Sequence, residues 1–229
     1  MKYDYLIVGS GLYGSVFAHE ATKIGKKCLI IEKNTHIGGN CYTENIDGIN
    51  IHVYGPHIFH TNDKEIWDYI NQFAIFNSYK HIVRVNYLNR IYSFPINLLT
   101  FYQLDNSIIT PNDAVEFLEK NRVKVNNPNN LEEWSLDQVG PQIYETFIKG
   151  YTTKQWNRNP TLLPKSIIKR IPIRTNFDDN YYFDKYQGIP IGGYTRIFEN
   201  LTKNIEIRLN TNFFEDRKFF ESLADNIVY

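Results

Sequence analysis

The chain has 229 residues, with 25 Lys and Arg against 25 Asp and Glu, so its formal net charge is zero. This balance, without a local basic run, excludes the electrostatic footprint of a nucleic-acid or anionic-membrane binder. No apolar stretch reaches the roughly eighteen residues of a membrane span, and the N-terminus lacks a secretory signal. We therefore expect a soluble cytoplasmic protein without nucleic-acid or membrane partners.

The cysteines and the aromatic residues indicate which kinds of site the chain can form. Cys28 and Cys41 show neither CxxC nor metal-ligand spacing, and Cys28 lies in an apolar strand pattern, which predicts a buried, unreactive thiol. Aromatic residues make up 15% of the chain, with 17 Tyr. This content exceeds the needs of a core and suits a site that stacks planar ligands.

The chain opens with the pattern of a βαβ unit. Short apolar runs at residues 5–8 and 27–32 predict two buried parallel strands. Between them, apolar residues at helical spacing predict a helix over residues 12–24, ended by Gly25. The crossover of such a unit is right-handed by default.

A G-x-G-x-x-G turn joins the first strand to this helix. Gly9 permits the tight turn, Gly11 lets the backbone approach a pyrophosphate, and Gly14 lets helix and strand pack closely. The helix N-terminus offers free N–H groups to phosphates. Glu32 ends the second strand, where a carboxylate accepts hydrogen bonds from ribose hydroxyls. The alternative is an ordinary glycine-rich turn in a domain that binds no nucleotide.

The choice between NAD and FAD depends on the residues after Glu32. Gly38 and Gly39 form a second glycine pair there, which resembles flavoproteins of the amine-oxidase type. Two glycines let a loop lie against the cofactor without a side-chain clash. The sequence therefore predicts FAD.

The remaining elements point to an α/β fold with an insertion. We expect hairpins at residues 41–59 and 82–94, turning at Asp47–Gly48 and near Asn89. We expect helices at 63–73 (capped by Thr61 or Asn62), 112–122, 131–138, 141–150 and 194–201, and strands at 206–209 and 226–229. Residues 1–80 and 187–229 are assigned to a discontinuous, incomplete FAD-binding domain. Residues 81–186 are assigned to an inserted part with a β-hairpin and a helical substrate-binding block.

Two histidines three residues apart follow the Gly55–Pro56 turn. His57 and His60 flank aromatic and aliphatic residues in this loop, and a site role is favoured over ordinary core or surface placement. No third ligand is evident, so no metal site is predicted.

Two further segments combine aromatic and cationic side chains. Residues 147–156 can be a helix end capped by Gly150 with core aromatics, or part of a site. Residues 167–174 place cations between prolines, and tyrosines follow at 181, 182 and 186. Together they form a plausible mobile arm for a diphosphate, although composition alone leaves this open.

Seven motifs together resemble one family over the whole chain. They are GSGLYG, IEKNTHIGGN, YGPHIFHTND, IKGYTTKQW, IIKRIPIR, DNYYFDKYQGIPIGGYT and the final NIVY. In this order and spacing they are similar to the N-terminal portion of the prokaryotic UDP-galactopyranose mutases. The resemblance implies an isomerase that interconverts UDP-galactopyranose and UDP-galactofuranose for surface polysaccharide and cell-wall precursors. It implies reduced FAD, whose N5 attacks the anomeric carbon as UDP leaves; the adduct then opens through an iminium, and the sugar recloses as the other ring.

The resemblance also implies roles for individual residues. Arg170 matches the mobile-loop arginine that grips the diphosphate, and we take it as the catalytic residue. The positions that match substrate contacts, including the uracil-stacking aromatics, are His81, Phe147, Tyr151, Thr152, Trp156 and Tyr181. Those that match FAD contacts are Gly9, Gly11, Leu12, Tyr13, Gly14, Glu32, Lys33, Gly39, Asn40, His57, Ile58 and Phe213.

The chain departs from the family in length. Family members continue with the rest of an antiparallel β-sheet domain, so we expect the C-terminal part of the fold to be missing and this chain to be a truncated, inactive form. A homodimer is left open for the full-length protein. Two alternatives remain: an amine-oxidase-like FAD oxidoreductase, and a non-catalytic flavin- or nucleotide-binding fragment.

Overall fold

The computed structural model describes residues 2–169 and 171–229. The chain forms two compact units, each with its own core. The first unit combines residues 1–79 with 184–229, and the second comprises residues 80–183. The chain therefore leaves the first unit once, builds the second, and returns.

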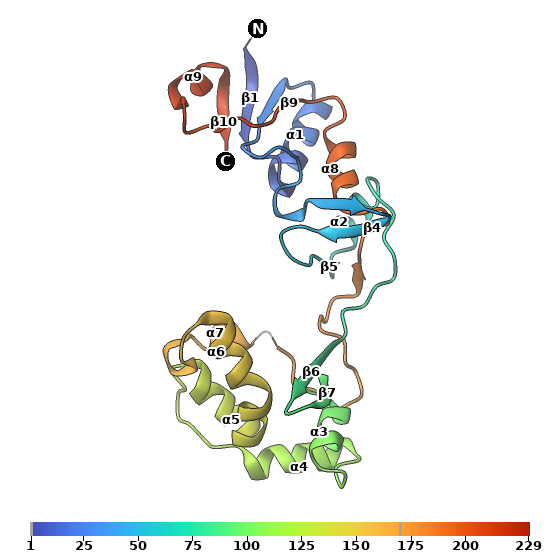
Figure 1. Ribbon diagram of the computed structural model, residues 1–229, viewed down its shortest axis with the longest axis vertical. Coiled ribbons are helices and arrows are strands. Elements are labelled where there is room, and N and C mark those ends of the chain that lie inside the picture. The colour runs from blue at the N-terminus through green and yellow to red at the C-terminus, as the bar shows by residue number, and fades with distance from the viewer. Residues whose placement is uncertain (1, 170) are drawn as a thin grey trace. The chain divides into compact units, whose positions relative to one another are not determined.

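A parallel sheet of four strands organises the first unit (Figure 1). Its order is β10 (Ala224–Val228), β1 (Tyr3–Val8), β2 (Cys28–Ile31) and β9 (Glu206–Arg208). All three strand pairs are parallel. The two apolar runs near the N-terminus form neighbouring strands joined by a helix, which confirms the predicted βαβ unit.

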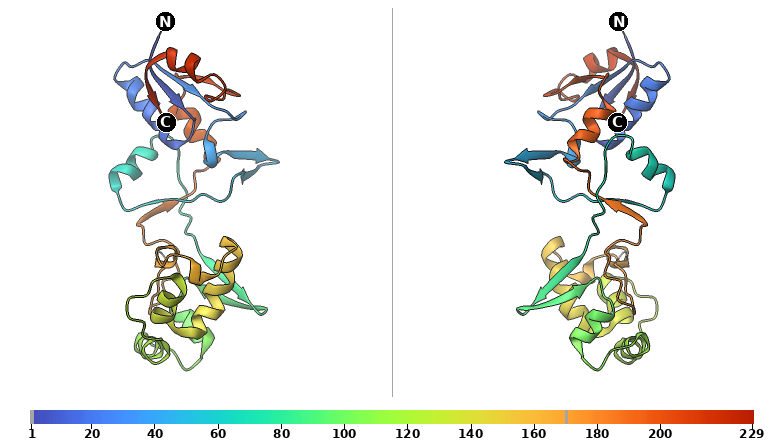
Figure 2. Two further views of the ribbon diagram at one scale, coloured as in Figure 1. Left: turned by 90° about the vertical axis from the view of Figure 1, so that its left-hand side faces the viewer. Right: turned by 90° about the vertical axis from the view of Figure 1, so that its right-hand side faces the viewer.

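Both faces of this sheet are covered, which explains the uninterrupted apolar strands. Helix α1 (Leu12–Lys23) packs on one face and helix α9 (Arg217–Ser222) on the other (Figure 2). Successive strand residues point to opposite faces. The α1 face contains Ile7, Ile30, Ala18 and Ala21, and the α9 face contains Leu6, Leu29, Ile31, Phe213 and Phe220.

Two small antiparallel sheets extend the first unit. Strands β3 (Thr43–Ile46) and β4 (Ile49–His52) form the hairpin predicted around Asp47–Gly48. Both turn residues have positive φ, 51° and 82°, as a two-residue type I′ turn requires. Strand β5 (Phe59–Thr61) pairs with β8 (Tyr186–Gly188), which joins chain segments far apart in the sequence.

Helix α2 (Lys64–Ile70) corrects one predicted helix cap. We expected Thr61 or Asn62 to cap it, but the Asp63 carboxylate accepts the N–H groups of Glu65 and Ile66, at 2.8 and 3.3 Å. The Thr61 hydroxyl instead accepts the N–H of Asp63. Three consecutive residues can all act as caps, so composition alone did not fix the position.

The remaining short elements of the first unit complete its structure. They are η1 (Gly39–Cys41), a 3₁₀ turn after the second glycine pair, and α8 (Thr195–Leu201), the predicted helix after the glycine-rich loop. Phe198 and Leu201 of α8 are buried against Ile70 and Phe73 at the end of α2. This packing holds α8 beside the segment that carries the two histidines.

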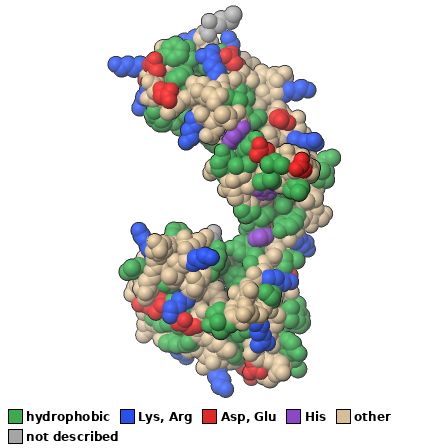
Figure 3. Space-filling view, in the orientation of Figure 1, with side chains coloured by type: hydrophobic (Ala, Val, Ile, Leu, Met, Phe, Trp, Pro, Cys, Tyr) green, Lys and Arg blue, Asp and Glu red, His purple; other side chains and the backbone are tan. Residues whose placement is uncertain are grey.

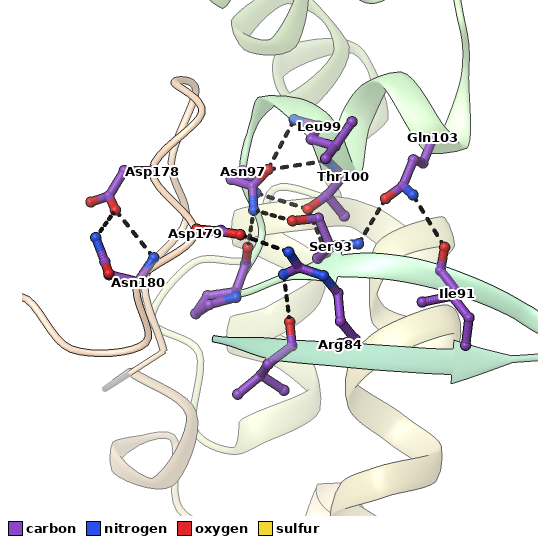
Figure 4. A network of polar contacts seen from close by, with 12 residues as sticks. Arg84, Ile91, Ser93, Asn97, Leu99, Thr100, Gln103, Asp178, Asp179 and Asn180 are labelled. Carbon is purple, nitrogen blue, oxygen red and sulfur yellow. Dashed lines mark hydrogen bonds and ion pairs between the residues drawn. The ribbon is translucent and has the colours of Figure 1, made fainter. Parts of the chain in front are cut away.

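A hairpin and a capped helix open the second unit. Strands β6 (Val83–Tyr87) and β7 (Arg90–Phe94) pair around Leu88 and Asn89, both at positive φ. Helix α3 (Leu98–Leu104), which we did not predict, begins with a capping box at Asn97. The Asn97 amide donates to the Ser93 hydroxyl at 2.9 Å and fastens the helix to the hairpin (Figure 4).

The helical block confirms one predicted break and corrects one predicted cap, both at glycines. Helix α4 (Pro111–Asn121) confirms the helix predicted at residues 112–122 and starts at a Thr110 capping box. Helix α5 (Leu131–Ile143) has a kink at Gly140 (φ 74°, ψ 174°), before Pro141, where the backbone is not helical, which confirms the break predicted between residues 138 and 141. Gly150 has φ −63° and lies inside the continuing helix, so its predicted role as a C-terminal cap is wrong.

The same helical path continues without a loop. A π-helical segment, η2 (Tyr144–Lys149), follows α5 and passes directly into α6 (Gly150–Trp156). Shorter turns η3 (Pro160–Leu162) and α7 (Ser166–Lys169) complete the block. Its buried core includes Tyr92, Phe101, Leu131, Ile143, Tyr144 and Phe147.

The kink gives a matched pair of stability predictions. A Cβ at Gly140 would lie 2.4 Å from the Asn121 carbonyl oxygen, in a backbone conformation that L-residues avoid. We expect Gly140→Ala to lower the free energy of unfolding by about 2–4 kcal/mol. Gly150→Ala meets no atom within 4 Å and should raise it by about 0.5–1 kcal/mol. Chemical denaturation measures both, and equal effects of the two substitutions would contradict the kink.

Candidate functional site

The predicted turn is present at the carboxyl end of β1. Gly9 has φ +100°, and its N–H donates to the Ile31 carbonyl at 2.8 Å. Gly11 is the N-cap of α1, where no side chain caps the helix and the first turn contains no acidic residue. The helix N-terminus thus keeps its N–H groups and positive dipole available for an anion.

Two glycines of the turn have different structural roles. A Cβ at Gly14 would lie 2.3 Å from the Gly9 carbonyl oxygen, so Gly14 is needed for close packing of helix and strand. A Cβ at Gly11 would meet no protein atom within 4 Å. The space beside Gly11 is therefore open, as a backbone that approaches a phosphate requires.

Glu32 is tied to this turn by hydrogen bonds. Its side chain is 5% exposed, and Oε2 accepts the Ser10 N–H and hydroxyl at 2.9 and 2.8 Å. Oε1 accepts the N–H of Asn34 at 2.9 Å. Burial alone would raise the pKa of the carboxyl, but these hydrogen bonds hold the pKa below its usual value. Glu32 is therefore an anion at neutral pH.

The second glycine pair lies against the first turn. Gly38 has φ +98°, and its N–H donates to the Ser10 carbonyl at 3.0 Å. A Cβ at Gly39, whose φ is +53°, would approach the Gly11 Cα to 3.1 Å. Both glycine motifs and Glu32 therefore meet at one edge of the sheet.

A cavity of about 110 Å³ lies beside the start of α1. Leu12, His57 and Ile58 line it, together with Cys41 and residues of α8. His57 Nε2 is buried and has no hydrogen-bond partner in the described part of the chain. A buried polar atom of this kind indicates a group that the cavity takes up.

The two predicted histidines take different positions. His57 lines the cavity, whereas His60 Nδ1 lies 2.5 Å from an oxygen of the Asp184 carboxylate. Asn62 donates to the other oxygen of that carboxylate. His60 thus holds the point where the chain returns to the first unit, and the structure does not bring the two imidazoles into one site.

The other predicted cofactor residues of the first unit are spread over its surface and core. Tyr13, Lys33 and Asn40 are exposed. Phe213 is only 2% exposed and packs in the core beneath the sheet, against Phe220. Its position shows a packing role, and its contact with an adenine ring stays a prediction.

The predicted base-stacking aromatics divide between surface and core. Tyr151 and Trp156 of α6 are 63% and 45% exposed. Phe147 is 4% exposed, and its ring meets Tyr92 edge-on at 5.1 Å between centroids. Thr152 is also buried. Tyr151 and Trp156 are thus available to a planar ligand, whereas Phe147 supports the core beneath α6.

The remaining substrate positions lie on two other segments of the second unit. The Tyr181 N–H donates to the His81 carbonyl at 2.9 Å, and their rings meet edge-on at 5.2 Å. The structure therefore brings these two predicted residues together. Arg170, the predicted catalytic residue, lies outside the described residues.

Three polar or reactive residues that the structure places in or near the candidate sites had no role assigned from the sequence. Ser10, the main partner of Glu32, stands at a variable position of the glycine motif and carries no signal of its own. Cys41 lines the cavity, but burial raises the pKa of its thiol and of Cys28, which disfavours a thiolate nucleophile. Arg174, in the predicted mobile arm, is buried.

Charged side chains of both signs lie on the face drawn in Figure 3. Basic and acidic side chains are interspersed over the visible face of each unit (Figure 3). Within residues 2–169 and 171–229, no three His, Cys, Asp or Glu side chains gather as a metal site. None of the helices described is both long and apolar enough to cross a membrane.

Comparison with known proteins agrees with this geometry. The profile of NAD(P)-binding Rossmann-like domains matches residues 7–73, so the first unit belongs to the dinucleotide-binding Rossmann-like class. The profile described as UDP-galactopyranose mutase matches residues 146–229.

Two relatives extend the similarity over most of the chain. A dTDP-fucopyranose mutase of Escherichia coli is 43% identical over 89% of this chain and 55% of its own length. A probable UDP-galactopyranose mutase of Klebsiella pneumoniae is 40% identical over 94% of this chain and 57% of its own. The chain is thus a homologue of the UDP-galactopyranose mutases, as its motifs predicted, and spans about half the length of these relatives.

Solved structures support the fold. A reduced UDP-galactopyranose mutase superposes with a TM-score of 0.69 at 20% identity, over 91% of this chain and 48% of the other. A putrescine oxidase gives a TM-score of 0.53 at 15% identity, over 92% and 51%. At these identities both show the fold alone, so the amine-oxidase alternative has the less specific support.

The hydrogen bonds of Glu32 predict a pH dependence of stability. Because folding lowers its pKa, Glu32 stabilises the fold above its unfolded pKa, and this contribution is lost as pH falls through the folded value. Glu32→Gln should lower the free energy of unfolding at pH 7 by about 1.5–3 kcal/mol. The difference in unfolding free energy between this variant and the wild type should become smaller as the pH falls below about 5. Denaturant titrations at several pH values measure it, with Glu44→Gln on the exposed hairpin as a control that should show neither effect.

Proposed function

We propose that this protein is a flavin-dependent mutase that interconverts UDP-galactopyranose and UDP-galactofuranose. The observation that carries the proposal is the 40–43% identity to two sugar-ring mutases over about nine-tenths of the chain. The dinucleotide-binding turn, with Glu32 and the second glycine pair around it, supports the same conclusion. The chain covers only part of these relatives, so the activity is proposed for the complete protein.

The residues of the first unit fit an FAD molecule. The open space at Gly11 and the uncapped start of α1 suit its pyrophosphate, and Glu32 suits the ribose. The unpartnered Nε2 of His57 and the cavity beside Leu12 suit a polar group of the cofactor. In reduced form, the flavin would supply the nucleophilic centre for a ring interconversion without net redox change.

The second unit would bind the nucleotide sugar. Tyr151 and Trp156 present exposed aromatic faces to a pyrimidine, and Tyr181 with His81 offers a second polar and aromatic pair. We assign Arg170 to the diphosphate, where a guanidinium offsets the charge that develops as UDP departs.

The E. coli relative supports a second candidate substrate. Its printed activity, dTDP-fucopyranose mutase, has a different nucleotide and sugar and the higher identity of the two relatives. Thymine adds one methyl group to uracil, the nucleoside of dTDP lacks the 2′-hydroxyl of uridine, and fucose lacks the 6-hydroxyl of galactose. A single methyl changes discrimination by only about 1–3 kcal/mol, whereas a site that hydrogen-bonds a hydroxyl rejects the analogue without it far more strongly. The contacts to these two hydroxyl positions would therefore decide between the two substrates.

The proposal extends to the cellular role. A furanose product would supply precursors of surface polysaccharide, and we propose a cytoplasmic location for the enzyme. A homodimer is the proposed assembly of the complete protein.

The activity is tested on the complete natural gene product that contains these 229 residues. After flavin reduction with dithionite, it is incubated separately with UDP-galactofuranose and dTDP-fucofuranose, and the ring isomers are separated by chromatography. Formation of UDP-galactopyranose supports the first candidate, and conversion of only the dTDP sugar supports the second. Oxidation of an amine without ring interconversion would instead indicate the amine-oxidase alternative.

Flavin binding should depend on Gly11. Its φ and ψ, −71° and −177°, suit any residue, and a Cβ there would meet no protein atom within 4 Å, so we expect Gly11→Val to fold. The side chain would fill the space of the pyrophosphate, and we expect FAD affinity to fall at least about ten-fold. The yellow absorbance of the purified protein measures this, with Gly150→Ala as the control that keeps it. Full flavin content in the valine variant would show that the assignment is wrong.

Nucleotide binding should depend on Tyr151 more than on Phe147. Stacking on an aromatic side chain is worth about 1–3 kcal/mol per base, so Tyr151→Ala should weaken UDP binding by about ten- to a hundred-fold. Because Tyr151 is exposed, Tyr151→Ala should change the free energy of unfolding little. Phe147→Ala should instead lower the unfolding free energy by about 3–5 kcal/mol. Calorimetric titration and denaturation separate the two effects, and unchanged UDP affinity in Tyr151→Ala would return Tyr151 to a surface role.

A further inference from the structure

Arg174 is a buried cation that the proposed function has not used. Its side chain is 93% buried, in the second unit. Its backbone N–H donates to the Ile96 carbonyl at 2.9 Å, next to the bridge between Ile96 and Ile173. The residue is therefore anchored to the segment that follows the β6–β7 hairpin.

The loop of residues 178–183 wraps around this guanidinium. Nη1 donates to the carbonyl oxygens of Asn180 and Asp178, at 2.7 and 3.4 Å. Nε lies 3.3 Å from the Asp178 carboxylate, and the Phe183 ring covers the guanidinium with its centroid 4.4 Å away. A buried charge without such partners is costly, so the position of the loop and the burial of Arg174 depend on each other.

The held loop carries Tyr181. Asn180, whose carbonyl takes the shortest bond from Arg174, precedes it directly and forms a bridge with Ile82. Tyr181 then donates its N–H to His81, and the two rings meet edge-on. The residue that accepts the hydrogen bond from the guanidinium, Asn180, is thus the direct neighbour of Tyr181 in the chain.

We propose that Arg174 is a positioning residue that fixes Tyr181 against His81 in the arrangement that binds the nucleotide sugar. This inference rests on the proposed function for the role of Tyr181. Arg174 acts through the loop, which is bonded to Nη1 and Nε, whereas the buried Nη2 has no hydrogen-bond partner among the described residues. A guanidinium suits this task because it stays charged and donates in several fixed directions.

A second arginine contacts the same loop and provides a matched control. Arg84 Nη2 donates to the Asp179 carboxylate at 2.9 Å, but the Arg84 side chain is 44% exposed (Figure 4). Exposed ion pairs contribute little to stability. Removing the charge at Arg84 should therefore leave the loop in place.

The test compares the complete protein with its Arg174→Gln, Arg174→Lys and Arg84→Gln variants. Hydrogen exchange read by mass spectrometry reports the loop of residues 178–183 and, separately, the helices of the second unit. We expect exchange in that loop to become about ten-fold faster in Arg174→Gln, with α5 and α6 unchanged. Arg174→Lys should recover part of the protection, and Arg84→Gln should match the wild type.

A double-mutant cycle with Tyr181→Ala separates positioning from general stability. UDP and dTDP affinities are measured by calorimetry. Arg174→Gln should weaken binding about ten-fold in the wild type and by less than about two-fold once Tyr181 is already removed. Additive losses, or unchanged exchange in the loop, would overturn the proposal. If the wild type binds neither nucleotide, the proposed function and the binding role of Arg174 both fail, while exchange still shows whether Arg174 holds the loop.

Discussion

The candidate dinucleotide site depends on the hydrogen bonds between Glu32 and Ser10. They join the residue after β2 to the turn after β1, so the carboxyl ends of two parallel strands are held as one edge. Gly38 adds a bond to the Ser10 carbonyl and brings the second glycine pair to the same edge. The uncapped start of α1 faces this place because Gly9 and Gly14 let helix and strand pack closely. Sheet, helix and loop thus meet where ligands bind in open α/β sheets.

Local signals predicted the parts of the fold that are decided locally. The glycine motif, the Asp47–Gly48 turn and the start of the helix predicted at residues 112–122 each depend on residues within a few positions, and the structure contains all three. The α2 cap was wrong because Asp63 competes with equally good neighbours. The break predicted between residues 138 and 141 is present at Gly140, where the Asn121 carbonyl leaves no room for a Cβ. The ligand contacts predicted from the resemblance stay predictions.

Packing of aromatic residues was the harder part to predict. Phe147 and Tyr151 are four residues apart, a spacing that places both on one face of an α-helix. The structure buries the first and exposes the second, across the passage from the π-helical segment to α6. A π-helix has a wider turn, so it changes which residues share a face, and such segments are frequent at functional sites. Sequence periodicity assumes one helical pitch and could not show this division.

In each of the two units, a buried charged side chain holds a short loop in one arrangement. Among the described residues, the only charged side chains in the buried set are Glu32 in the first unit and Arg174 in the second. Each is bonded mainly by groups of a short loop, Ser10 and Asn34 for the carboxylate, Asp178 and Asn180 for the guanidinium. A buried charge loses far more than an exposed one when its partners move away, so it restricts the loop to one arrangement. The exposed ion pairs elsewhere on the chain cannot impose this, because water replaces either partner at little cost.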